Sequence, residues 1–193
     1  MHTLVFATHN AHKVLEIGQI LGPDFTLKTL NDIGQAEEIP ETADTLEGNA
    51  RLKACFVQEK YGFDCFSEDT GLEVEALGGA PGVHTARYAG EGRDPEDNMR
   101  LLLRNLDGQT NRRARFRTVI ALLVGEQEIL LEGICNGRIA LEKRGTGGFG
   151  YDPVFIPDGF EQTFGELPDT LKNQISHRSQ ATRKLIEVLQ NLG

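Results

Sequence analysis

The sequence predicts an α/β fold with a mixed β-sheet, in one domain covering residues 1–193. Short apolar runs that enter polar turns alternate with segments of helical periodicity through the first half of the chain. Later, two long β-type runs at 114–125 and 127–141 follow each other across a tight polar turn, which predicts an antiparallel hairpin. The length of 193 residues suits one sizeable core.

The amino-terminal third begins with a strand, a helix and a second strand. TLVFA at 3–7 is a short apolar run that enters the polar turn THN. The following helix carries apolar residues at helical spacing and should end at Gly22-Pro23. FTLKTL at 25–30 alternates apolar and polar residues, as a half-buried strand does. The helix face consists of Val14, Ile17 and Leu21.

A second helix and a third strand come next. Asp44 with Glu47 three residues later has the pattern of a capping box, and the helix should end at Gly62. FDCFS at 63–67 is then expected to be a strand that ends at the pair Glu68-Asp69. The apolar helix face consists of Leu46, Ala50, Ala54, Val57 and Tyr61.

Two further helices are expected in the second half. Asp94-Pro95 supplies a cap residue and a proline at the first helical position, so a helix should run from there to about Leu106. Residues 176–193 have the apolar periodicity of a closing helix, with Ser176 as its cap. Between them, the glycine-rich segment 144–155 leads into a last loop.

Composition excludes several classes of protein. The net charge of -9 gives no basic face for DNA or RNA, although a local pocket could still bind a small anion. The three cysteines form no CxxC pair, which argues against zinc and disulfides and favours a reducing cytoplasm. No run of 18 apolar residues occurs, so we expect no membrane span and no signal peptide.

The turn after the first strand could bind phosphate. Thr8 and Asn10 offer hydrogen-bonding groups, and Lys13 lies in the first helical turn, where backbone N–H groups and the helix dipole favour anions. The plainer interpretation is that Asn10 caps the helix and Lys13 is solvated. The Walker pattern is absent.

The acids Glu41, Glu68 and Asp69 form the second candidate cluster. Hard divalent cations such as Mg²⁺ prefer carboxylate oxygens. Because neighbouring side chains on an extended strand point to opposite faces, Glu68 and Asp69 can share one ion only if the chain bends at Thr70-Gly71. The alternative is an ordinary surface turn with an Asp near a Gly for backbone reasons.

Two carboxy-terminal segments complete the candidate site. Lys172, His177 and Arg178 could neutralise a triphosphate, or they could be solvated surface charges. In the segment GTGGFGYDPVF, glycines allow close backbone approach while Phe149 or Tyr151 stacks on a base. The alternative is a turn with two core aromatics.

In this order, these segments resemble the Ham1/RdgB-like family of inosine triphosphate pyrophosphatases. The resemblance reaches from residue 6 to residue 181. It rests on FATHNAHK, ETADTLEGNARLKA, SEDTGLEVEALGGAPGVHTARYAG, GTGGFGYDPVF and KNQISHRSQA.

The resemblance implies an elongated mixed sheet with two lobes around a substrate cleft, a homodimer, and Mg²⁺-dependent cleavage of non-standard purine nucleoside triphosphates between the α and β phosphates. Asp69 would be the catalytic base, with Glu41, Glu68 and Asp69 around the metal; which of Glu68 and Asp69 ligates directly is left open. The implied substrate-binding residues are Thr8, His9, Asn10, Ala11, His12, Lys13, Lys53, Thr70, Phe149, Gly150, Tyr151, Asp152, Lys172, His177 and Arg178.

Two other functions are compatible with parts of this pattern. A Maf-like nucleotide pyrophosphatase would share the chemistry, but the chain lacks the Ser-rich and Arg-rich amino-terminal loop of that family. A nucleotide-binding regulatory protein without turnover would have no need of a general base, so the set of acids argues against it.

Overall fold

The computed structural model describes residues 2–21 and 25–192. The expected helix end at Gly22-Pro23 lies outside these residues. The described helices are α1 (Ala11–Leu21), α2 (Leu46–Tyr61), α3 (Pro95–Asn105), α4 (Asp169–Ile175) and α5 (His177–Leu192). The strands are β1 (His2–Phe6), β2 (Phe25–Thr29), β3 (Cys65–Val74), β4 (Pro81–Gly82), β5 (Arg113–Val124), β6 (Gln127–Ile139) and β7 (Phe155–Pro157).

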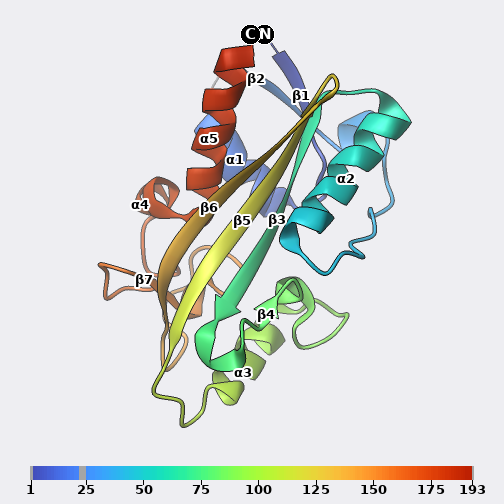
Figure 1. Cartoon of the computed structure of the whole chain (residues 1–193). Coiled ribbons are helices and arrows are strands. Elements are labelled where there is room, and N and C mark those ends of the chain that lie inside the picture. The colour runs from blue at the N-terminus through green and yellow to red at the C-terminus, as the bar shows by residue number, and fades with distance from the viewer. Residues whose placement is uncertain (1, 22–24, 193) are drawn as a thin grey trace. The chain divides into compact units, whose positions relative to one another are not determined.

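The strands form one mixed sheet with the order β2-β1-β3-β5-β6-β7, and β4 pairs with β3 (Figure 1). β1 runs parallel to both β2 and β3, with Leu4 opposite Leu27 and Phe6 opposite Phe66. β5 and β6 are neighbours joined by a two-residue turn, which only an antiparallel pair allows. The expected mixed α/β fold and its hairpin are therefore confirmed.

The chain divides into two compact units, which match the two lobes that the resemblance implies. Unit 1 contains the described residues up to Asp69, Thr118–Gly133 and the residues from His177 onward; unit 2 contains Thr70–Arg117 and Ile134–Ser176. β3, β5 and β6 each contribute residues to both units. The substrate cleft stays a prediction.

In unit 1, helices cover both faces of β3. Phe66 packs in a core with Ile17 of α1 and with Ala181 and Leu185 of α5. On the opposite face, the thiol of Cys65 donates to the Ala54 carbonyl of α2 at 3.2 Å, and the hydroxyl of Ser67 donates to the Ala50 carbonyl. This alternation fixes which way each later residue of the strand points.

The core of unit 2 contains an aromatic cluster. The ring centroids of Phe116 and Phe155 lie 4.7 Å apart, and those of Phe155 and Phe164 lie 5.3 Å apart. Met99 and Leu102 of α3 pack into the same core, as the apolar spacing of that helix predicts. The side chain of Asp94 accepts a hydrogen bond from the Asp97 amide, which confirms the predicted cap.

Several element boundaries differ from the prediction. The cap of α2 is Thr45, not Asp44, because the extended backbone at Thr45 lets its hydroxyl accept from the Gly48 amide at 3.0 Å. β2 is half-buried along its whole length rather than alternating. α4 was not expected; it ends at Ile175, and only Ser176 separates it from α5.

All three cysteines are thiols, as predicted. Burial raises the pKa of Cys65 and of Cys135 to about 12. Burial, followed by the negative charge of Glu128, also raises the pKa of the half-buried Cys55. Because the thiolate is the nucleophile, we expect iodoacetamide at pH 8 to modify Cys55 first and to leave Cys65 and Cys135 unmodified in the folded protein.

Peptide mass spectrometry after timed labelling measures this order, with labelling in guanidinium chloride as the control that exposes all three thiols. Labelling of Cys135 as fast as Cys55 in the folded protein would contradict the assignment.

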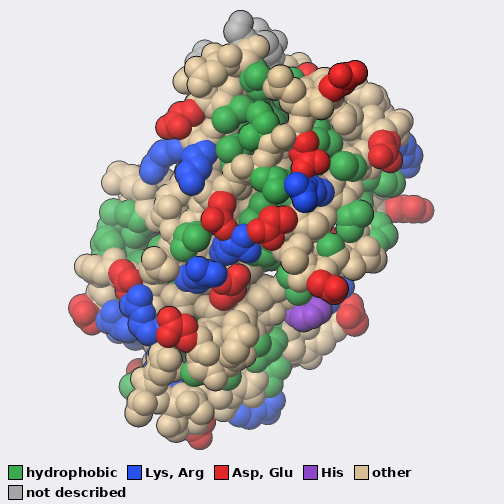
Figure 2. Space-filling model, in the orientation of Figure 1, with side chains coloured by type: hydrophobic (Ala, Val, Ile, Leu, Met, Phe, Trp, Pro, Cys, Tyr) green, Lys and Arg blue, Asp and Glu red, His purple; other side chains and the backbone are tan. Residues whose placement is uncertain are grey.

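Charged side chains of both signs are interspersed on the face that Figure 2 shows. On β5, Arg113 pairs with Asp158 at 2.9 Å, and Arg115 pairs with Glu73 at 2.6 Å. Positive charge along this strand is therefore offset by carboxylates of the same unit. Within the described part of the chain, every helix is too short or too polar to cross a membrane.

Candidate active site

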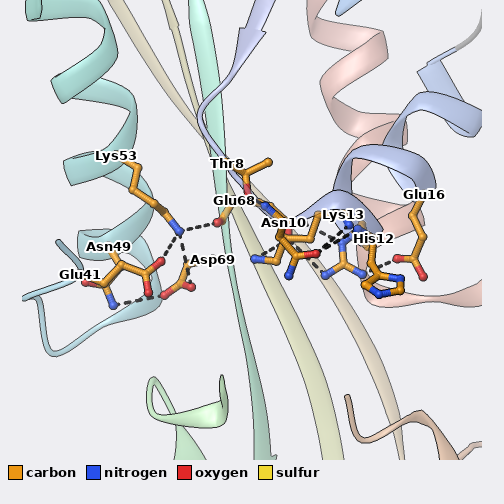
Figure 3. A network of polar contacts seen from close by, with 11 residues as sticks. Thr8, Asn10, His12, Lys13, Glu16, Glu41, Asn49, Lys53, Glu68 and Asp69 are labelled. Atoms are coloured by element: carbon orange, nitrogen blue, oxygen red, sulfur yellow. Dashed lines mark hydrogen bonds and ion pairs between the residues drawn. The ribbon is translucent and has the colours of Figure 1, made fainter. Parts of the chain in front are cut away.

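The strand β3 continues straight through Glu68, Asp69 and Thr70, so the predicted bend at Thr70-Gly71 is wrong. The turn comes later, at 75–79. Successive side chains on β3 point to opposite faces, and Glu68 and Asp69 accordingly contact different partners (Figure 3). The two neighbouring carboxylates therefore do not meet.

The carboxylate of Asp69 lies on the α2 side of the strand. Its Oδ2 accepts a hydrogen bond from the Asn49 amide at 3.2 Å, and its Oδ1 lies 3.8 Å from the Lys53 ammonium. The same ammonium contacts Glu41 Oε1 at 2.5 Å and the Glu68 carbonyl at 2.8 Å. Lys53 thus joins the carboxylates of Glu41 and Asp69, as predicted for parts of one site (Figure 3).

This arrangement perturbs the acidity of Asp69. Burial raises its pKa above the usual value for an aspartate, and the nearby Glu41 charge acts in the same direction. The positive charges of Lys53 and Lys13 and the Asn49 hydrogen bond oppose the shift without cancelling it. A carboxylate with a raised pKa holds a proton more readily, which suits a general base.

The carboxylate of Glu68 lies on the opposite side of the strand, between two cations. Its Oε1 contacts Lys13 at 2.8 Å, and its Oε2 accepts from Arg178 Nε at 2.9 Å. Burial alone would raise the pKa of Glu68, but the positive charges of Arg178 and Lys13 outweigh burial and lower it. Glu68 is therefore a buried anion whose oxygens already accept from protein groups.

The plainer interpretation of the amino-terminal loop is correct for Asn10 and wrong for Lys13, and phosphate binding stays a prediction. Asn10 caps α1, because its Oδ1 accepts from the amides of His12 and Lys13 at 3.1 and 3.2 Å. Lys13, however, is not solvated but paired with Glu68. The other loop residues contact protein groups or are exposed. The Thr8 hydroxyl accepts from the Asn10 amide, and the His9 ring contacts the Glu37 carbonyl. Ala11 and His12 are exposed in the first turn of α1.

The carboxy-terminal cations are buried, so the interpretation as solvated surface charge is wrong. His177 and Arg178 occupy the first turn of α5, where positive charge opposes the helix dipole. The guanidinium of Arg178 donates to both Glu68 oxygens and to Glu16. The anions that offset the dipole are thus the protein's own carboxylates.

In unit 2, Asp152 organises the glycine-rich segment. Its Oδ2 accepts from Lys172 Nζ at 2.7 Å and from the Phe149 amide at 2.8 Å, and Lys172 Nζ lies 5.1 Å from the Phe149 ring centroid. A Cβ at Gly148 would lie 2.1 Å from Asp152 Oδ2, so only glycine fits there, at φ +70°. Gly150 also has a positive φ, +61°. Phe149, Asp152 and Lys172 therefore contact one another, and their role in substrate binding stays a prediction.

Tyr151 does not belong to this group of contacting residues. Its ring packs in the core of unit 2, and its hydroxyl donates to the Thr85 carbonyl at 2.8 Å. The alternative of a core aromatic is correct for Tyr151, and base stacking by that ring is not supported. Thr70 continues β3 and is half-buried.

The oxygen donors fit a divalent cation on the Asp69 side only. Glu41 Oε1 and Asp69 Oδ1 both lie near the positive charge of Lys53, and Mg²⁺ is commonly bound by one or two carboxylates together with phosphate oxygens. Across residues 2–21 and 25–192, no three His, Cys, Asp or Glu side chains are grouped closely enough to hold a metal. The predicted three-carboxylate set is therefore not assembled, because Glu68 points away.

Two residues that the sequence reasoning missed complete the polar network. Asn49 joins Asp69 to the Ala43 amide, and Glu16 is a partner of Arg178. Asn49 could have been noticed, because it lies one turn before Lys53 on the face of α2 that also carries Ala50. A polar residue on an apolar helix face needs a buried partner. No comparable signal marks Glu16.

Comparison with known proteins shows the family of this chain. The Ham1 family profile matches residues 4–188. The dITP/XTP pyrophosphatase of Porphyromonas gingivalis is 54% identical over 190 residues, covering 98% of each chain, and that of Flavobacterium johnsoniae is 52% identical over 186 residues, covering 96% of this chain and 97% of the relative. The Staphylococcus aureus Ham1 structure superposes with a TM-score of 0.91 at 34% identity, covering 99% of this chain and all of that one. The chain belongs to the Ham1 family.

Proposed function

We propose that this protein hydrolyses non-standard purine nucleoside triphosphates such as ITP, dITP and XTP to a nucleoside monophosphate and pyrophosphate, with Mg²⁺ as cofactor. The observation that carries the proposal is the convergence of Glu41 and Asp69 on Lys53 in a member of the Ham1 family. Relatives more than half identical to this chain bear the name dITP/XTP pyrophosphatase. A homodimer and a cytoplasmic location belong to the same proposal.

In the proposed reaction, the protein takes part in one proton transfer. A water molecule attacks the α-phosphorus, its oxygen forms the new P–O bond, and Asp69 accepts its proton. The bond between the α-phosphorus and the bridging oxygen breaks, and pyrophosphate leaves. Mg²⁺, when bound at Glu41 and Asp69, offsets negative charge on the phosphates. The raised pKa of Asp69 supports its role as base.

The other predicted residues divide between phosphate binding and base binding. Backbone amides of the loop from Thr8 to Lys13 and the Lys53 ammonium are the proposed phosphate contacts. Phe149, with Asp152 and Lys172 beside it, is proposed to contact the base together with His177. Arg178 acts by orienting Glu68, because its Nε and Nη2 donate to the two Glu68 oxygens while its Nη1 donates to Glu16.

The test of the reaction is product identity. Purified protein is incubated with ITP, dITP, XTP, GTP and ATP, with and without Mg²⁺, and phosphorus NMR distinguishes pyrophosphate from orthophosphate. We expect pyrophosphate with ITP, dITP and XTP, in the presence of Mg²⁺ only. Release of orthophosphate would contradict cleavage at the α-phosphorus, and binding without turnover would instead favour a regulatory protein.

Base selection gives a second expected result. A 6-oxo purine accepts a hydrogen bond from a buried donor, for which the His177 side chain is the candidate, whereas a 6-amino group leaves that donor without a partner. An unpaired buried donor costs about 1–3 kcal/mol, so kcat/KM for ITP should exceed that for ATP by roughly 10- to 100-fold. Equal values for the two nucleotides would refute this selection.

A further inference from the structure

The acidic loop that carries Glu41 has no helix or strand between Gln35 and Thr45. Polar contacts hold it near both ends. Gln35 Nε2 donates to the Glu37 carbonyl at 2.8 Å, and the Ala43 amide donates to Asn49 Oδ1 at 2.9 Å. The position of Glu41 therefore depends on these anchors as well as on its own ion pair with Lys53.

Asn49 uses both ends of its side-chain amide. Its Oδ1 accepts from the Ala43 amide, and its Nδ2 donates to Asp69 Oδ2 at 3.2 Å. Only this orientation satisfies both neighbours, because a backbone N–H needs an acceptor and a carboxylate needs a donor. The residue is 1% exposed, so water does not replace these bonds easily. One buried amide thus connects the acidic loop to β3.

This bridge also determines which oxygen of Asp69 faces Lys53. With Oδ2 bound to Asn49, Oδ1 is the oxygen nearer to Lys53, at 3.8 Å. Glu41 Oε1 lies 2.5 Å from the same ammonium. The two carboxylate oxygens that could bind a cation are therefore aimed at one place by Asn49 and Lys53 (Figure 3).

Packing gives independent support for a fixed loop position. A Cβ added at Gly48 would lie 2.5 Å from Ala43 Cβ and 3.1 Å from Thr45 Oγ1. The segment at Ala43 thus lies against the first turn of α2, and the absence of a side chain at Gly48 allows this close approach. The hydrogen bond from Ala43 to Asn49 and this contact fix the same point of the loop.

We infer that Asn49 is a positioning residue that sets Glu41 and Asp69 at the separation needed to bind a divalent cation. The inference rests on the proposed function for the identity of the cation, but it makes a statement about metal affinity that is separate from turnover. Residues that orient metal ligands from behind typically change metal affinity by about 10- to 100-fold when replaced.

The experiment measures Mn²⁺ binding to the protein alone, by the EPR signal of unbound Mn²⁺, for wild type, Asn49→Ala and Asn49→Ser. We expect the dissociation constant to rise about 10- to 100-fold in both variants. The Mg²⁺ concentration for half-maximal ITP hydrolysis should rise by a similar factor, while KM for ITP at saturating Mg²⁺ changes less than about threefold, since Asn49 is not among the proposed phosphate contacts.

Asn98→Ala is the matched control. Asn98 is also a buried helical amide that fixes a loop, since it accepts from the Ala89 amide at 2.6 Å and donates to the Ala86 carbonyl at 2.9 Å, but it touches neither Glu41 nor Asp69. Asn98→Ala should lower the melting temperature about as much as Asn49→Ala and leave the Mn²⁺ dissociation constant unchanged. A purely structural role for Asn49 predicts the same behaviour for both.

Unchanged Mn²⁺ affinity in a folded Asn49 variant overturns the inference, as does an equal loss of affinity in Asn98→Ala. If Asn49→Ala does not fold, Asn49→Ser decides, because it keeps a polar side chain that is too short to bridge Ala43 and Asp69. A wild-type protein that binds Mn²⁺ but releases no pyrophosphate from any nucleotide would refute the proposed function and leave the binding comparison valid.

Discussion

Replacing Asp69 with asparagine should lower kcat for ITP by about 10²- to 10⁴-fold, the usual contribution of a general base. Asparagine has nearly the same shape, but its amide cannot take a proton from water at neutral pH. One of its side-chain groups can still bond to Asn49, so the fold of unit 1 should persist. Nucleotide affinity should change little, because the predicted phosphate and base contacts come from other residues.

Steady-state kinetics at saturating Mg²⁺ give kcat, and equilibrium dialysis of ITP with the slow variant gives the affinity. Asp94→Asn is the matched control: it makes the same chemical change at the cap of α3, where asparagine caps equally well, and it should leave kcat unchanged. A kcat for Asp69→Asn within threefold of wild type would remove Asp69 from the role of base.

Local sequence patterns predicted most of the elements of this fold. The cap of α3 at Asp94 and the αL glycine Gly62 after α2 lie where the sequence predicts them. The apolar faces of α1, α2 and α3 follow the predicted periodicity. The extent of β3 was the main error. The pair Thr70-Gly71 has the composition of a turn, yet the strand continues through it, because pairing with neighbouring strands overrides local preference.

That error had a consequence for the site. A bend would have brought Glu68 and Asp69 together, whereas a continuous strand separates their side chains by the ordinary alternation of β-structure. Adjacent carboxylates in a sequence therefore indicate one metal site only after the backbone between them is known. Here Asp69 faces Lys53 and Glu41, and Glu68 takes part in a separate network of charges.

The burial of the carboxy-terminal cations could not be predicted from local patterns. Arg178 is separated by 110 residues from Glu68 and by 162 from Glu16, and such distant ion pairs leave no periodic signal. Positive charge in the first turn of α5 opposes the helix dipole, which indicates that an anion lies nearby. This reasoning could not indicate that the anion belongs to the protein rather than to a ligand.

Replacing Glu68 with glutamine should destabilise the protein by about 3–5 kcal/mol, the usual result of removing one charge from a buried pair. The Glu68 side chain is 0% exposed and that of Arg178 is 2% exposed, so water cannot solvate the guanidinium after the change. The glutamine amide would also direct a donor toward either Arg178 or Lys13, both of which are donors only.

Urea unfolding followed by circular dichroism measures the loss, and Glu128→Gln is the control. Glu128 forms an exposed pair with Arg51 in the same unit, and a pair of that kind contributes at most about 1 kcal/mol. Salt should distinguish the two sites as well, since 0.5 M NaCl screens the exposed pair but not the buried one. If both substitutions cost under 1 kcal/mol, then Arg178 keeps enough stabilisation from Glu16 alone, and Glu68 is retained for a reason other than stability.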